Sequence, residues 1–90
     1  MAQFMIGSET FDAGSVDDGN EVTKEITVTG AVLGDFVLVS YSIDVTDLEY
    51  SGQVTTADTV TTVLSNNTGS AIDLASATVR ALVISFGIFE

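Results

Sequence analysis

The 90-residue sequence contains no cysteine, histidine, proline or tryptophan. Disulfides, thiolate metal sites and every catalytic arrangement that needs histidine or cysteine are therefore excluded. Cations are also scarce, because Lys24 and Arg80 stand against 13 acidic residues and leave a formal net charge of −11. Binding to phosphate backbones needs a surface rich in Lys and Arg, so we expect no nucleic acid and no anionic membrane as a partner.

Targeting and membrane-spanning segments are not expected either. The first residues lack the basic stretch and the long apolar core of a signal peptide. The apolar stretch 81–89 is interrupted by Ser85 and Gly87, and it is shorter than the roughly 20 residues of a membrane helix.

The residues that are present favour strands. Residues 22–29 alternate between apolar and polar side chains, a period-two pattern typical of a half-buried strand. Residues 50–55 and 59–65 are expected to pair as a hairpin, because the short connection between them suits a tight turn.

Two further segments are apolar on both faces. Residues 36–41 predict a central strand or one that is covered on both sides. In residues 78–86, Leu82, Ile84 and Phe86 share one face, with Arg80 at its outer end. This segment predicts a central core strand, with a surface buried against another subunit as the alternative.

The first 20 residues have mixed polarity and are expected to form an N-terminal arm, or one short strand followed by an acidic loop. That strand would lie around residues 3–6 or 9–11. Short helical turns are expected at residues 46–49, where "TDLE" matches a capping box, and within residues 70–76.

One domain is expected, with its core in residues 21–90. The spacing of strands and turns predicts an all-β fold, a small antiparallel β-sandwich or β-barrel of about five to seven short strands.

Gly30 and Gly34 raise the question of a phosphate-binding loop. Asp35 follows them and would repel phosphate, and a strand rather than a helix comes next. A membrane GxxxG contact would need a long apolar surround, which Asp35 interrupts. The segment therefore predicts a corner between two strands, with Leu33 plugging the end of the core.

Carboxylate chemistry is all that this composition leaves for catalysis. A glycosidase needs two carboxyl groups across a cleft, so we expect no enzyme activity and no catalytic residues. Acidic and amide side chains gather on the loop before the first alternating segment: Asp12, Asp17, Asp18, Asn20 and Glu21. Their spacing does not match a calcium loop, so we expect an ordinary acidic loop with no metal and no cofactor. The "NNTG" segment at 66–69 fits a glycosylation sequon but is interpreted as a turn.

Three segments together resemble small β domains encoded by tailed bacteriophages. They read "TGAVLGDFVLV" from Thr29, "VTTVLSNNTG" from Val60 and "AIDLAS" from Ala71. The resemblance extends over residues 22–83. It implies a virion structural protein, with no catalytic residues to transfer.

The resemblance and the acidity lead to one leading hypothesis. The chain is expected to be a head decoration (cement) protein that binds the outer surface of a capsid lattice, through the major capsid protein, alone or as a homo-oligomer. It would reside on the virion after assembly in the host cytoplasm. The alternative is a tail fibre or adhesin-type β domain that binds a host surface ligand. The candidate interface comprises apolar residues near both termini: Phe4, Ile6, Phe11, Phe86, Ile88 and Phe89.

Overall fold

The computed structural model describes residues 3–86, and these residues form eight strands and no helix. In chain order the strands are β1 (Gln3–Phe11), β2 (Gly14–Val16), β3 (Glu21–Thr27), β4 (Phe36–Tyr41), β5 (Glu49–Thr56), β6 (Thr59–Ser65), β7 (Ile72–Leu74) and β8 (Ala77–Ser85). Every pairing among them is antiparallel. The predicted all-β class is confirmed, with one strand more than the largest number expected.

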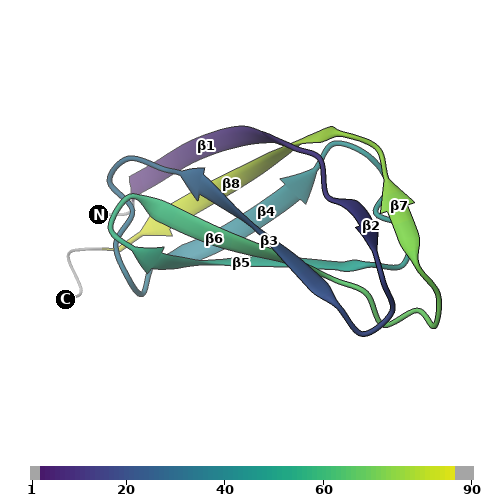
Figure 1. Cartoon of the computed structure of the whole chain (residues 1–90). Helices are drawn as coiled ribbons and strands as arrows, with labels where there is room; N and C mark the ends of the chain where they lie inside the picture. Colours follow the sequence, from purple (N-terminus) through teal and green to yellow (C-terminus); the bar gives the residue numbers. More distant parts are fainter. Residues whose placement is uncertain (1–2, 87–90) are drawn as a thin grey trace.

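The strands form two layers (Figure 1). One layer is a three-stranded sheet in the order β1-β8-β4, and the other is a three-stranded sheet in the order β3-β6-β5. The short strands β2 and β7 pair with each other at one end, while β1 begins and β8 ends at the opposite end. The protein is a small antiparallel β-sandwich, elongated to 45 × 21 × 18 Å.

The core lies between the two layers. Val79, Ala81 and Val83 point inward from β8 and are fully buried, and they belong to one cluster with Ile26 of β3 and Val60 of β6. Each fully buried Val or Ile side chain contributes about 1.5–3 kcal/mol relative to an exposed one. A second, smaller cluster joins the β2–β7 end to the main body: Val16, Leu48, Leu64 and Leu74.

The N-terminal residues are an integral part of the β1-β8-β4 sheet. β1 pairs with β8 along its whole length, from Gln3 opposite Ser85 to Phe11 opposite Ala77. One continuous strand thus spans both of the short strands offered by the sequence, and these residues do not form a separate arm. The mixed polarity of residues 3–11 does not by itself predict a long strand, and pairing with the apolar strand β8 holds them in one.

The prediction for β4 is wrong in one respect. β8 is the central strand of its sheet, as expected, but β4 pairs with β8 alone among the described residues and therefore lies at an edge. Its inward side chains pack on the core, whereas Phe36 and Leu38 on the outer face are 64% and 62% exposed. The two-sided apolar pattern of β4 is therefore covered on one side only.

The Gly30–Gly34 segment is a corner made of two successive four-residue turns. The Ala31 N–H donates to the Val28 carbonyl at 3.1 Å, and the Asp35 N–H donates to the Val32 carbonyl at 3.1 Å. Each turn has glycine at its third position, with φ of 95° at Gly30 and 94° at Gly34. A type II turn requires positive φ at that position, which explains why the two glycines are four residues apart.

The corner is held to the β5–β6 hairpin by Asp58. Its carboxylate Oδ1 accepts from the Gly30 N–H at 2.7 Å, and its backbone exchanges hydrogen bonds with Val28 and Ala31. The predicted corner is therefore confirmed, but the prediction for Leu33 is wrong. Ala31 is buried at this end of the core, whereas Leu33 is 67% exposed at the tip of the second turn.

Neither predicted helical turn exists. Thr46 and Asp47 have φ of 55° and 65°, and the Leu48 N–H donates to the Val45 carbonyl, which makes a type I′ turn. Ile72–Leu74 is strand β7, paired with β2. A capping box stabilises a helix only where an apolar helical face follows it, and here β5 begins directly after the turn.

Asn66 connects its own loop, between β6 and β7, to the end of β2. Its side chain is fully buried, and its Nδ2 donates to the carbonyls of Val16 and Ser70 at 2.7 and 2.9 Å. Its Oδ1 accepts from the backbone N–H and the hydroxyl of Thr68. The "NNTG" segment is therefore a turn, as predicted, and the Asn66 amide is engaged inside the fold.

Two tyrosines pack between the layers. The rings of Tyr41 from β4 and Tyr50 from β5 meet edge to face, with centroids 5.2 Å apart, and Phe11 packs on Tyr41 at 6.2 Å. Burial raises the pKa of both phenols above the ordinary value of 10.0. Each tyrosine is therefore favoured in its neutral form within the fold.

Asn66→Ala should lower the free energy of unfolding by about 2–4 kcal/mol, because the Val16 and Ser70 carbonyls lose their donor. The matched control is Asn67→Ala, since Asn67 is exposed and makes one hydrogen bond to Glu49. We expect the control to change stability by less than about 0.5 kcal/mol in urea unfolding. Equal effects of the two substitutions would contradict the role assigned to Asn66.

The stability of the protein should decrease as the pH rises above about 10, because Tyr41 and Tyr50 ionise more readily in the unfolded chain than in the fold. Their contribution is complete below pH 10 and is lost as the pH rises through the folded pKa values. Denaturant unfolding at several pH values should show a shallower decline in a Tyr41→Phe/Tyr50→Phe variant. An identical decline in both proteins would contradict this explanation.

Candidate functional site

The outer face of the β1-β8-β4 sheet is the most unusual surface of the described residues. Strand register places six apolar side chains there in two rows of three, which we call the apolar array. The first row is Phe4, Ile84 and Phe36, and the second row is Ile6, Leu82 and Leu38. Side chains opposite each other on neighbouring strands are close enough to form one continuous surface.

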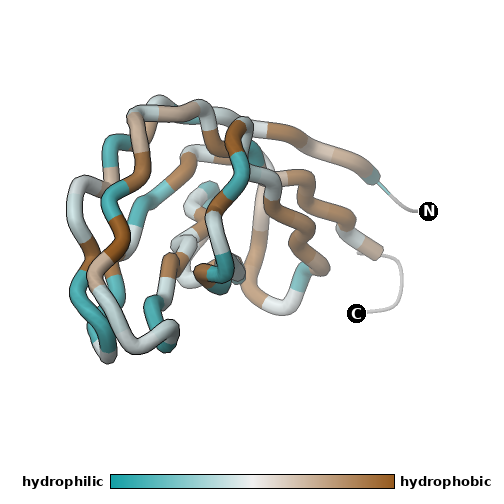
Figure 2. Tube along the Cα trace, turned by 90° about the vertical axis from the view of Figure 1, so that its right-hand side faces the viewer, coloured by the Kyte–Doolittle hydropathy of each residue, from teal (hydrophilic) through white to brown (hydrophobic). Residues whose placement is uncertain are grey.

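The apolar array is exposed at its edges and half-buried along its centre. Phe4, Ile6, Phe36 and Leu38 are 68%, 67%, 64% and 62% exposed. Phe86 extends the array beyond β8, and its ring meets that of Phe36 edge to face with centroids 5.7 Å apart. Figure 2 shows the result, since brown segments of the two strands that lead to the chain ends lie side by side, whereas the opposite layer alternates. A contiguous apolar patch of this kind indicates a contact surface.

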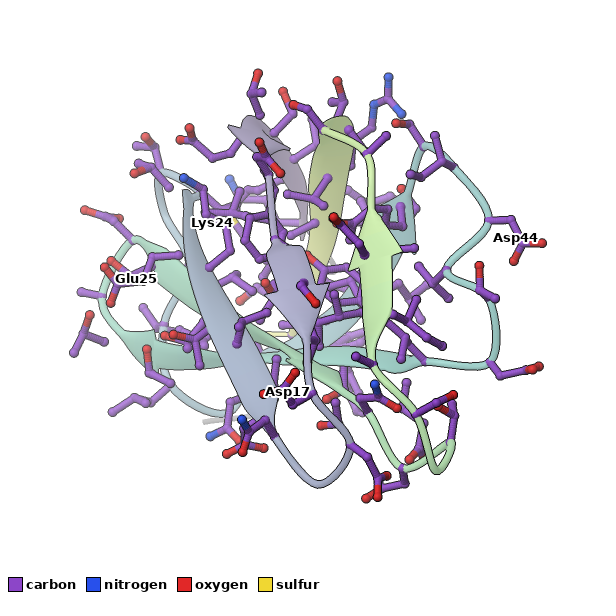
Figure 3. The ribbon with its side chains drawn as sticks, turned by 45° about the vertical axis from the view of Figure 1, so that its right-hand side comes forward. Asp17, Lys24, Glu25 and Asp44 are labelled. Atoms are coloured by element: carbon purple, nitrogen blue, oxygen red, sulfur yellow. The ribbon has the colours of Figure 1, made fainter. Side chains whose placement is uncertain are left out.

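Charge is distributed around this face rather than on it. The outward positions of the three strands carry no carboxylate, although the chain has 13 acidic residues. Arg80 is the one charged residue among them and lies in the next row, between Ser8 and Ser40. Acidic side chains project elsewhere, as Glu25 and Asp44 do in Figure 3. The face is therefore an acid-free area on a strongly acidic molecule.

A shallow hollow lies where the apolar array meets the Arg80 row. Its volume is about 160 Å³. Its lining is mainly aliphatic: Ile6, Leu38, Val39, Ser40, Arg80 and Leu82. The hollow is large enough for one apolar side chain of a contacting molecule and is too open to enclose a ligand.

The structure brings some of the predicted interface residues together. Phe4, Ile6 and Phe86 lie on or beside the apolar array. Ile88 and Phe89 lie outside the described residues. Phe36 and Leu38 are not among the predicted interface residues, because the sequence pattern predicts a strand that is central or covered on both sides.

Phe11 does not belong to this surface. It is 7% exposed and packs in the core against Tyr41, so its side chain is not available to a partner. The reason is the parity of strand positions. Phe4 and Phe11 are an odd number of residues apart on the continuous strand β1, so their side chains point to opposite faces of the sheet.

A polar hollow of about 510 Å³ lies near the edges of β1 and β3. Its lining is Glu9, Thr23, Lys24, Glu25, Thr27 and Thr61. It contains no aromatic side chain on which a sugar could stack, and its two carboxylates share the site with a lysine. We assign no chemistry to it.

The acidic loop organises turns. Asp12 Oδ1 accepts from the Gly14 N–H at 3.2 Å, and Asp18 Oδ1 accepts from the Gly69 N–H at 3.0 Å. Among residues 3–86, no three Asp or Glu side chains gather closely enough to hold a metal ion. The same part of the chain has no helix long and apolar enough to cross a membrane.

Comparisons with protein-family models, with curated proteins and with solved structures gave no match.

Replacing Leu38 with Ser should change the free energy of unfolding by less than about 1 kcal/mol, since its side chain is 62% exposed. The contrasting variant is Val83→Ser on the buried face of the same sheet, which should cost about 2–4 kcal/mol. Urea unfolding of the full chain measures both. Equal losses would show that the chain itself covers the outer face, and the face would then be part of the core.

Proposed function

We propose that the chain is a head decoration protein that binds the outer surface of a bacteriophage capsid lattice through the outer face of its β1-β8-β4 sheet. The observation that carries the proposal is the apolar array, an exposed and acid-free surface on a chain of net charge −11. Such a surface is stabilised when another protein covers it. The partner is the major capsid protein, and the location is the capsid surface, after assembly in the host cytoplasm.

The distribution of charge suits this role. The outward positions of β1, β8 and β4 carry no carboxylate, so covering the array buries no negative charge from these strands. A high negative charge keeps a protein dispersed at high copy number and repels packaged nucleic acid.

The residues of the phage-like motifs shape turns of the fold, and most of them do not belong to the docking surface. Gly30 and Gly34 shape the corner before β4, and Asn66 holds the turn after β6. Four of the six residues of the apolar array lie outside these motifs, on β1 and β8. The resemblance therefore points to a group of virion proteins, and the exposed face supports a specific way of docking.

Purified particles of the phage that encodes this chain should contain many copies, in a fixed ratio to the major capsid protein, measured by quantitative mass spectrometry. Leu82→Ser should reduce the copies per particle by at least about tenfold, because it interrupts the centre of the apolar array. The matched control is Val63→Ser, which changes a half-buried outward position on β6, the central strand of the other sheet.

Absence from particles, or presence at the tail tip alone, would overturn the proposal. Binding of the isolated protein to host cells, without capsid association, would instead support the tail fibre or adhesin alternative.

A further inference from the structure

We infer that the free protein forms a symmetric dimer in which two copies stack the outer faces of their β1-β8-β4 sheets, and that its own charge makes this dimer depend on salt. The inference does not rest on the proposed function, because it concerns the isolated chain. In this dimer, the apolar array of each copy is covered by the apolar array of the other copy.

The size of the face is the first argument. A phenylalanine side chain buries about 150–250 Å² when fully covered, and four residues of the array are between 62% and 68% exposed. The array and its rim therefore present on the order of 500 Å² of apolar surface. Two stacked faces would bury roughly 1,000 Å², which is about the minimum for a biological interface and is typical of a weak, reversible one.

Shape complementarity of the array with itself is the second argument. A twofold axis that runs across the strands, between the two rows, places β8 antiparallel to its own copy. The row of Phe4, Ile84 and Phe36 then lies over the aliphatic second row of the other copy, and large rings meet smaller branched chains. Sheets stack in this way about 10 Å apart with interdigitated side chains.

Charge within the contact is the third argument. Because no outward position of the three strands carries a carboxylate, stacking buries no carboxylate from these positions. Arg80 lies in the row next to the array, so the antiparallel arrangement keeps the two Arg80 side chains at opposite ends of the contact. A parallel arrangement would place them against each other.

Long-range repulsion opposes the dimer and makes it sensitive to salt. Each copy carries a net charge of −11, and the short dimensions of the molecule are 21 and 18 Å. With the facing sheets about 10 Å apart, the centres of two stacked copies are roughly 30 Å apart. The screening length is about 30 Å at 0.01 M salt and about 8 Å at 0.15 M. Repulsion between the copies is therefore only partly screened at low salt and is strongly screened at moderate salt.

The dimer would have a consequence for docking. It covers the apolar array in the free protein, so exposed phenylalanines do not lead to aggregation before the face meets a larger partner. A capsid lattice and a second copy would then compete for the same surface.

Sedimentation equilibrium of the full chain tests the inference in 0.01, 0.15 and 0.5 M NaCl. We expect a monomer–dimer equilibrium whose dissociation constant falls at least about a hundredfold between the lowest and the highest salt. At 0.5 M NaCl, Leu38→Glu should weaken the dimer by at least about tenfold, because it places an unpaired charge in the contact.

The matched control is Gln53→Glu, which adds the same charge at an exposed position on β5, in the opposite sheet. It should change the dissociation constant at 0.5 M NaCl by less than about threefold, because its charge stays in water. Ile6→Gln serves as a second, uncharged variant in the array, and circular dichroism with thermal melting checks that all variants fold.

A protein that stays monomeric at all three salt concentrations would overturn the inference, as would a dimer that survives both array substitutions or an assembly larger than a dimer. None of these results bears on whether the chain is present in virions, so the inference and the proposed function fail independently.

Discussion

The structure depends on the burial of one face of β8, a strand that is apolar on both faces. Val79, Ala81 and Val83 are fully buried between the layers, and β1 and β4 pair along either side of this strand. The other sheet, β3-β6-β5, covers that inner face and nothing else of β8. Leu82 and Ile84 are therefore left on an outer face that the described residues do not cover. The stability of the fold and the exposure of the apolar array are two results of the same arrangement.

Much of the scaffold follows from local chemistry that is readable in the sequence. Alternation in residues 22–29 predicts β3, and the β-branched segments around the Ala57–Asp58 connection predict the β5–β6 hairpin. Gly30 and Gly34 predict a corner, since a type II turn needs positive φ. The prediction that Leu33 fills the end of the core is wrong, because hydrophobicity alone cannot distinguish a buried side chain from one at the tip of a turn. Thr46 and Asp47 show the same difficulty, since a capping-box pattern also fits a type I′ turn.

The candidate site was less predictable, for a physical reason. A two-sided apolar strand such as β4 needs cover on both faces, but the sequence does not say whether the cover belongs to the same chain. The sequence pattern therefore predicts a central or covered strand and does not indicate Phe36 and Leu38 as surface residues. Phe11 is predicted as an interface residue but is buried. On one continuous strand, its odd spacing from Phe4 places it on the inner face. The length of β1 was the missing information, and it comes from pairing with β8 over nine residues.

The central claim is that the outer face of the β1-β8-β4 sheet is covered when the protein assembles. Hydroxyl-radical footprinting of the free chain in dilute solution at 0.01 M NaCl, compared with the concentrated chain at 0.5 M NaCl, tests it most directly. The account predicts that oxidation of Phe4 and Phe36 falls severalfold on assembly, while oxidation of Ile43, a 37%-exposed residue after β4, stays unchanged. Equal oxidation of Phe4 and Phe36 in both conditions, although the protein is assembled at the higher salt, would contradict it.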